Sequence, residues 1–143
     1  MRKRTKAREM SLQILYEIDI RKEPLSDLIN DFWGRPSISK SADKEIKKFV
    51  MQLVEGTIAQ SEVIDKTISA IAKNWQLKRM AVIDRNIIRM GAYELLFIED
   101  IPPKVSINEA VELAKRYGDV ESSKFVNGIL DKIHKESLST KGK

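Results

Sequence analysis

Two successive apolar patterns with helical spacing occupy residues 105–133, and they limit the folds that are open to this chain. Side chains three or four residues apart share one face of a helix, whereas alternate residues share one face of a strand. Every long apolar segment of the sequence has the helical period, and none alternates like a strand. The two patterns consist of Ile107, Ala110, Val111 and Ala114, and then Val126, Ile129, Leu130 and Ile133. We therefore predict an all-α fold of about seven helices.

Local signals predict where some of these helices begin and end. Ser106 and Glu109 have the spacing of a capping box, so we expect a helix to begin at about Ile107. Gly118 is expected to end that helix in the left-handed conformation. Ser61 is the expected N-cap of an earlier helix, and Asp84 is expected at the N-cap or in the first turn of a later one.

The length of 143 residues suits one modest domain or two small packed halves. We place an N-terminal helical half at about 1–75 and a C-terminal half at about 76–138. The ends, 1–6 and 138–143, are polar or basic and are expected to be flexible. The polar segment 35–40 is expected to be a loop.

The positive charge of the chain is concentrated at its N-terminus. Five of the 26 basic residues lie in residues 1–8, and the remaining 21 equal the 21 acidic residues. A basic arm on a neutral body is typical of binding to a nucleic-acid backbone. A frayed, solubilising terminus would have the same composition. The basic residues of the arm are Arg2, Lys3, Arg4, Lys6 and Arg8.

A polar junction separates the two helical patterns at residues 118–124. Its residues Glu121, Ser122 and Lys124 lie near the start of the second helix, where free backbone N–H groups attract anions. Tyr117 and Phe125 flank them, and aromatic rings beside such donors suit single-stranded nucleic acid. The alternative is that both rings cover the hydrophobic core.

The first predicted helix, from Thr5 to Ile20, has apolar residues on two opposite sides. Ala7, Met10 and Ile14 belong to one face, while the strip Leu12, Tyr16 and Ile20 lies nearly opposite it. This strip packs either against another part of the chain or against a partner protein.

The chain lacks the residues or motifs that several kinds of chemistry require. The chain contains no cysteine and one histidine, His134, and it has no motif for a catalytic centre, a metal site or a cofactor. It also has no uncharged apolar stretch of about 18 residues, so we expect a cytoplasmic protein without a membrane span. These patterns favour a nucleic-acid-binding protein, with a protein adaptor as the close alternative.

Three motifs then follow one another along most of the chain. They read RTKAREMSLQILYE at 4–17, DRNIIRMGAYEL at 84–95, and INEAVELAKRYG followed by KFVNGILD within 107–131. Together they resemble the NusB family of bacterial transcription antitermination factors. This resemblance implies two small packed helical bundles and no enzymatic activity. It also implies binding, together with the ribosomal protein NusE, to single-stranded boxA-type RNA of ribosomal RNA operons, so that RNA polymerase reads through terminators.

The resemblance also implies which residues carry these functions. The RNA surface of this chain would comprise Arg2, Lys3, Arg4, Lys6, Arg8, Tyr117, Glu121, Ser122, Lys124 and Phe125. The NusE surface would include Tyr16, Ile20 and Asp84, and we add Leu12 from the same apolar strip. The arm departs from an unbroken arginine block, because Thr5 and Ala7 interrupt it and two of its cations are lysines. Lysine cannot contact a phosphate with the planar fork of arginine.

Two other functions remain as alternatives. NusB-like domains also precede ribosomal RNA methyltransferases, but this chain has no cysteine nucleophile for that reaction. A helical DNA-binding regulator is the second alternative, although no helix-turn-helix pattern is apparent.

Overall fold

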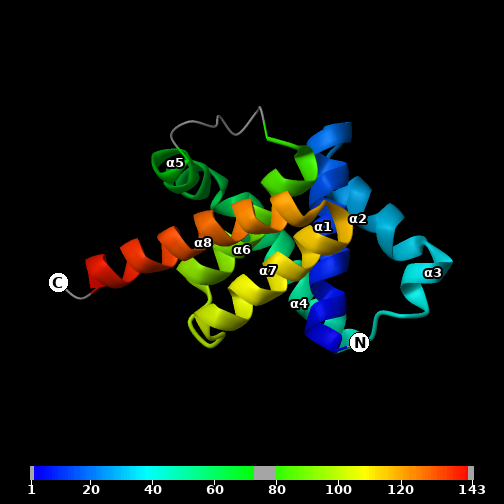
Figure 1. Cartoon of the computed structure of the whole chain (residues 1–143). Helices are drawn as coiled ribbons and strands as arrows, with labels where there is room; N and C mark the ends of the chain where they lie inside the picture. The colour runs from blue at the N-terminus through cyan, green and yellow to red at the C-terminus, as the bar shows by residue number, and fades with distance from the viewer. Residues whose placement is uncertain (1, 73–79, 142–143) are drawn as a thin grey trace. The chain divides into compact units, whose positions relative to one another are not determined.

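The computed structural model describes residues 2–72 and 80–141, and this part of the chain contains eight helices and no strand (Figure 1). The predicted all-α class is confirmed. The helices are α1 (Lys3–Arg21), α2 (Leu25–Gly34), α3 (Pro36–Ser39), α4 (Lys44–Ala59), α5 (Ser61–Ile71), α6 (Val82–Phe97), α7 (Pro103–Tyr117) and α8 (Val120–Lys141).

The chain divides into two compact units, Met1–Gly56 and Thr57–Lys143. From the sequence we divided it at about residue 75, which lies outside the described residues, so that division stays a prediction. The first unit holds α1, α2, α3 and most of α4, and the second holds α5 to α8.

In the first unit, α1 buries the face that its spacing predicted, including Ala7, Met10 and Ile14. The helix ends where Lys22 adopts a left-handed conformation (φ 56°) and donates its N–H to the carbonyl of Ile18 at 3.0 Å. α2 contacts α1 and buries Leu28 and Phe32.

One prediction for the first unit was wrong. The expected loop at 35–40 contains the short helix α3, because Pro36 stands at its first position, where a fixed φ favours helix and no N–H is needed. Residues 1–6 were expected to be flexible, which stays a prediction, and α1 begins at Lys3. Most of the arm is therefore the first turns of a helix.

In the second unit, α6, α7 and α8 pack against one another, and α5 contacts α6 and α8 (Figure 1). Ile87, Ala114 and Leu130 are fully buried among them. A Cβ at Gly91 of α6 would lie 2.8 Å from a methyl carbon of Leu130, so glycine permits α8 to approach α6 closely. Between α5 and α6, Arg89 donates two hydrogen bonds to Asp65, at 2.8 and 3.0 Å.

Two predicted helix starts in this unit were wrong. α7 begins at Pro103, so Ser106 lies inside the helix and donates its hydroxyl to buried Glu94 at 2.9 Å instead of capping. The N-cap of α5 is Gln60, and Ser61 is the first residue of the helix. Of the tail 138–143, residues 138–141 continue α8 and 142–143 lie outside the described residues, so the expected flexibility of the tail stays a prediction.

Candidate nucleic-acid interface

The junction between α7 and α8 consists of Gly118 and Asp119. Asp119 caps α8, since its Oδ1 accepts the backbone N–H of Ser122 at 2.7 Å. This hydrogen bond lowers the pKa of Asp119. Glu121, Ser122 and Lys124 thus form the first turns of α8, as the sequence predicted.

Gly118 is needed for close packing at this junction. Its φ of −118° is not left-handed, so the predicted left-handed cap was wrong. A Cβ at this position would lie 2.9 Å from the carbonyl oxygen of Ala114 and 2.9 Å from the hydroxyl of Ser122. α8 therefore begins so close to the last turn of α7 that no side chain fits between them.

Asp84 joins the junction from the first turn of α6, a position that the sequence predicted. The Ser122 hydroxyl donates to Asp84 Oδ2 at 3.1 Å. The other carboxylate oxygen of Asp84, Oδ1, is buried and accepts no hydrogen bond within the described residues. Burial raises the pKa of Asp84, and the hydrogen bond from Ser122 only partly opposes that shift.

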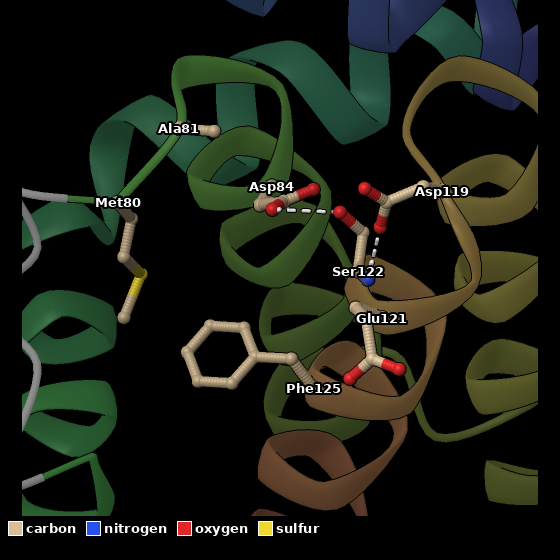
Figure 2. Close-up of a pocket in the computed structure, with 7 residues that line it drawn as sticks. All are labelled: Met80, Ala81, Asp84, Asp119, Glu121, Ser122 and Phe125. Carbon is tan, nitrogen blue, oxygen red and sulfur yellow. Dashed lines mark hydrogen bonds between the residues drawn. The ribbon is translucent and has the colours of Figure 1, made fainter.

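These residues line a pocket of about 350 Å³, which we call the junction pocket (Figure 2). Its lining consists of Met80, Ala81, Asp84, Asp119, Glu121, Ser122 and Phe125. The half-buried ring of Phe125 extends toward Met80, as Figure 2 shows. Tyr117, at the end of α7, is 46% exposed, so it does not simply cover the core.

Carboxylates dominate the charge of the junction pocket. Asp84, Asp119 and Glu121 all line it, and Glu121 forms an ion pair with the exposed ammonium of Lys124 at 3.7 Å. Such a pocket repels phosphate groups and accepts hydrogen bonds from amino or hydroxyl groups. Beside an aromatic ring, it suits a nucleic-acid base better than a backbone.

The basic arm is attached to the start of α4. Lys3 forms salt bridges with Asp43 at 2.9 Å and Glu45 at 3.0 Å, and these hydrogen-bonded carboxylates raise the pKa of Lys3. The guanidinium carbon of Arg4 lies 4.6 Å from the centre of the Phe49 ring. Lys3 is therefore already neutralised by the protein.

Arg8 was predicted to contact RNA, but the structure places its side chain among the buried residues. Its side chain is 2% exposed, and its guanidinium carbon lies 5.3 Å from the centre of the Phe49 ring. The helical spacing of α1 carries Arg8 onto the buried face, next to Ala7. Arg2 and Arg4 are exposed and Lys6 is half-buried, so these three cations of the arm remain available to a ligand.

A second, shallower pocket of about 290 Å³ lies beside the arm, and we call it the arm groove. Its lining consists of Lys3, Arg4, Glu45, Ile46, Lys48, Phe49 and Gln52. Lys48 and Gln52 were not among the residues that the sequence predicted for an RNA surface. Their spacing of four residues puts them on one side of α4, but the periodicity of α4 carries no signal that this side meets the arm.

The predicted partner strip on α1 is only partly on the surface. Leu12, which we predicted to belong to a partner surface, is 2% exposed and lies in the core. Tyr16 is half-buried, and Ile20 is 51% exposed. The strip crosses from the core to the surface along the helix, and its C-terminal half alone can reach a partner.

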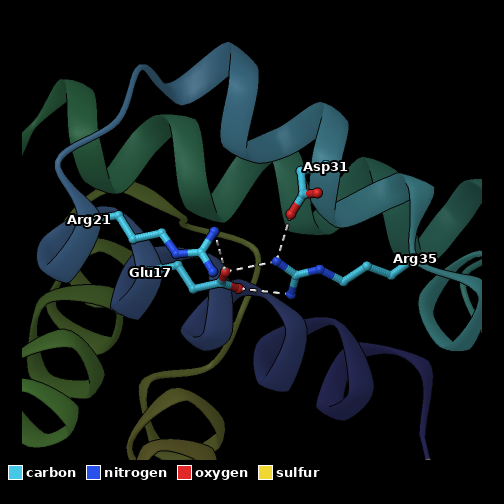
Figure 3. A network of polar contacts seen from close by, with 4 residues as sticks. All are labelled: Glu17, Arg21, Asp31 and Arg35. Atoms are coloured by element: carbon cyan, nitrogen blue, oxygen red, sulfur yellow. Dashed lines mark hydrogen bonds and ion pairs between the residues drawn. The ribbon is translucent and has the colours of Figure 1, made fainter.

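A polar network of Glu17, Arg21, Asp31 and Arg35 joins α1 to α2 (Figure 3). Arg35 donates two hydrogen bonds to Glu17, at 3.0 and 2.8 Å, and one to Asp31 at 2.8 Å. Arg21 lies 3.6 Å from Glu17. The hydrogen bonds from Arg35 lower the pKa of Glu17. The network connects the end of α2 to the C-terminal half of α1 by charge-assisted bonds.

The described residues contain no candidate metal cluster and no candidate membrane span. Within 2–72 and 80–141 there is no group of three or more histidine, aspartate or glutamate side chains that could hold a metal ion. Among the same residues, no helix has the length and apolar character needed to cross a membrane.

Known proteins similar to this chain are found by sequence and by structure. The model of the NusB family matches residues 5–135. The chain is 45% identical over 144 residues to the transcription antitermination protein NusB of Thermodesulfovibrio yellowstonii, covering 95% of this chain and 94% of that protein. It is 48% identical over 130 residues to the protein of the same name from Trichlorobacter lovleyi, with coverages of 91% and 89%.

Two solved structures have the same fold. NusB of T. maritima is 39% identical, with a TM-score of 0.84 over 93% of this chain and 91% of that chain. A chain in the crystal structure of antitermination factors NusB and NusE in complex with dsRNA is 30% identical. Its TM-score is 0.83 over 95% of this chain and 98% of that chain.

Proposed function

Because the chain belongs to the NusB family, we propose that it is an RNA-binding transcription antitermination factor. Together with the ribosomal protein NusE it binds boxA-type RNA of ribosomal RNA operons and promotes read-through by RNA polymerase. Two relatives that it matches over most of their length are named transcription antitermination proteins. A third similar protein is seen in complex with NusE and dsRNA.

The observation that carries this proposal is the junction pocket. Phe125 provides a ring face, while Asp84 and Glu121 provide acceptors for amino and hydroxyl groups. Unpaired bases offer both a face for stacking and exocyclic amino groups, and the ribose 2′-hydroxyl can donate as well. We therefore assign the junction pocket, with Tyr117 at its side, to the bases of the RNA and not to its phosphates.

The arm is assigned to the phosphate backbone. Arg2, Arg4 and Lys6 supply the accessible positive charge there, and they lie on the first turns of α1. A cation that neutralises a phosphate releases a counterion, so this part of the affinity depends on salt and not on sequence.

The NusE surface is assigned to Tyr16 and Ile20, which follow each other by one helical turn on α1. A half-buried tyrosine beside an exposed isoleucine suits an interface that buries apolar area. Asp84 is also proposed as an acidic contact for this basic ribosomal protein. Since Asp84 shares the junction pocket with the proposed RNA residues, a partner that reaches it lies beside the RNA.

Binding measurements test the proposed function directly. We expect a fluorescent single-stranded boxA-type RNA to bind more tightly than a scrambled RNA, duplex RNA or duplex DNA. Added NusE should tighten the binding of the boxA-type RNA and leave the binding of the other three nucleic acids unchanged. Preference for duplex DNA would support a DNA-binding regulator instead, and preference for duplex RNA would contradict the single-stranded target.

A matched pair of variants tests the role of the junction pocket. Phe125→Leu keeps an apolar side chain but removes the ring face, and we expect RNA binding to weaken by about 1 kcal/mol or more. Phe97→Leu is the control, because Phe97 is also partly exposed, in α6, and does not line the pocket. Equal RNA affinity of the two variants would remove the pocket from the proposed site.

A further inference from the structure

The arm groove contains more positive charge than the protein uses for its own contacts. The groove lies between the first turn of α1 and the first half of α4, both within the first unit. Lys3, Arg4 and Lys48 are its cations, and Glu45 is its one acidic residue. Which of these charges a ligand can reach follows from their contacts.

Lys3 and Glu45 are already engaged with each other. The ammonium of Lys3 contacts Glu45 at 3.0 Å and Asp43 at 2.9 Å, so one cation is shared by two carboxylates. The two acids beside the groove are thereby partly neutralised. Arg4 and Lys48 remain as the cations that can attract an anion.

Arg4 is held in place by an aromatic ring. Its guanidinium lies over Phe49, 4.6 Å from the ring centre, and Phe49 is itself 6% exposed and fixed in the core. A guanidinium over a ring keeps its N–H groups at the edge of the stack, where they can donate to a phosphate. Less side-chain freedom is then lost when the phosphate binds.

Lys48 and Gln52 are the unengaged donors of the groove. They are exposed and lie four residues apart on one side of α4. Neither side chain has a hydrogen bond or ion pair to any residue in the described part of the chain. Both lie outside the RNA surface predicted from the sequence, which comprised the arm and the junction alone.

We propose that the arm groove binds the phosphate backbone of RNA, with Arg4, Lys48 and Gln52 as its ligands. This inference rests on the proposed RNA-binding function and extends the phosphate surface from the arm onto α4. Arg4 and Lys48 supply charge, and the Gln52 amide supplies a neutral donor one turn further along. The competing explanation is that Lys48 is an ordinary solvated lysine.

The first test removes one charge and measures salt dependence. We would measure the affinity of a single-stranded boxA-type RNA oligonucleotide for Lys48→Gln at several salt concentrations. Losing one phosphate contact should flatten the slope of log affinity against log salt by about 0.7. Between about 50 and 200 mM salt, the loss of affinity should then be about 2.6-fold smaller than for the wild type.

The matched control removes a charge from the next position of the same helix. The ammonium of Lys47 lies over Trp33, 5.0 Å from the ring centre, and Lys47 does not line the groove. Lys47→Gln should therefore leave the slope close to that of the wild type. A slope for Lys48→Gln equal to that for Lys47→Gln would overturn the inference.

A second test adds a charge, so that loss of folding cannot produce the expected result. Gln52→Lys should steepen the slope by about 0.7. Asn30→Lys, at an exposed position of α2 outside the groove, should leave the slope unchanged. Equal slopes for these two variants would also overturn the inference. If the wild type bound the RNA but Lys48→Gln and Gln52→Lys left the salt slope unchanged, the proposed function would stand without this groove. If the wild type bound no RNA, both would fall.

Discussion

At the scale of single residues, Gly118 and Gly128 differ sharply in the space around them. A Cβ at Gly118 would lie 2.9 Å from a backbone carbonyl oxygen, whereas a Cβ at Gly128, within α8, would meet no atom within 4 Å. Both glycines belong to the third motif of the sequence, where nothing distinguishes their roles.

We predict opposite effects of alanine at these two glycines. Gly118→Ala should lower the free energy of unfolding by about 1 to 3 kcal/mol, because the backbone carbonyl of Ala114 must move. Gly128→Ala should raise it by about 0.5 to 1 kcal/mol, because alanine favours helix and fits freely. Urea unfolding of both variants measures this. The same sign for both would contradict the packing described for the junction.

Ser106 offers a second contrast at this scale. Its hydroxyl donates to Glu94 inside the core, so Ser106→Ala should destabilise the protein by about 1.5 to 3 kcal/mol. Ser61→Ala is the control, because Ser61 is an exposed first residue of α5, and it should change stability by less than about 0.5 kcal/mol. Comparable losses in thermal melts would mean that the Ser106 hydrogen bond contributes little.

At the scale of elements, a hydrogen bond from Ser122 to Asp84 joins the start of α8 to the start of α6. The carboxylate of Asp84 is partly buried there, whereas that of Asp119 is exposed and accepts backbone N–H groups. Two acids of the same junction therefore have pKa values shifted in opposite directions. As the pH rises, the titration of Asp84 and the titration of Asp119 should therefore change the stability of the protein in opposite directions.

For Asp84 the folded-state pKa is above the unfolded-state value of about 3.9. Its contribution to stability is thus fully present below that value and is lost as the pH rises through the folded-state pKa. Asp84→Asn removes the charge and keeps an acceptor for Ser122. We expect the variant to melt higher than the wild type at neutral pH, with the difference vanishing below about pH 3.9.

Asp119→Asn is the matched control for this pH dependence. The pKa of Asp119 is lowered in the folded state, so its charge stabilises above the unfolded-state pKa, and that contribution is lost as the pH falls. This variant should melt lower than the wild type at neutral pH. A lower melting temperature for Asp84→Asn as well would show that burial does not dominate at Asp84.

At the scale of the whole molecule, the predicted partner strip on α1 contains one buried position and two that a partner can reach. Leu12 is 2% exposed and Ile20 is 51% exposed, with half-buried Tyr16 between them. Only the accessible end can bind a partner, while the buried end holds the fold together.

Two variants should separate stability from partner binding. Tyr16→Ala should weaken NusE binding by about 1 to 3 kcal/mol and lower the melting temperature only slightly. Leu12→Ala should destabilise the protein by about 2 to 5 kcal/mol, with NusE affinity per folded molecule unchanged. Calorimetric titration and thermal melts measure both quantities. Loss of stability alone in Tyr16→Ala would assign the strip to the core.

Much of this molecule is predictable from local sequence. The helical period predicted the all-α class and the buried face of α1, because that period depends only on neighbouring residues. The same reasoning placed Asp84 in the first turn of α6 and Glu121, Ser122 and Lys124 at the start of α8. The charge of the arm was visible in composition alone.

The tertiary structure alone decided which of these side chains are free to act. Arg8 and Leu12 are buried, Ser106 bonds Glu94, and Gly118 is required by the approach of α8. The arm groove exists because α4 passes beside the first turn of α1, although some 40 residues separate Lys3 from Glu45. Burial and hydrogen-bond partners depend on contacts between residues distant in the chain, and no local period or cap contains that information.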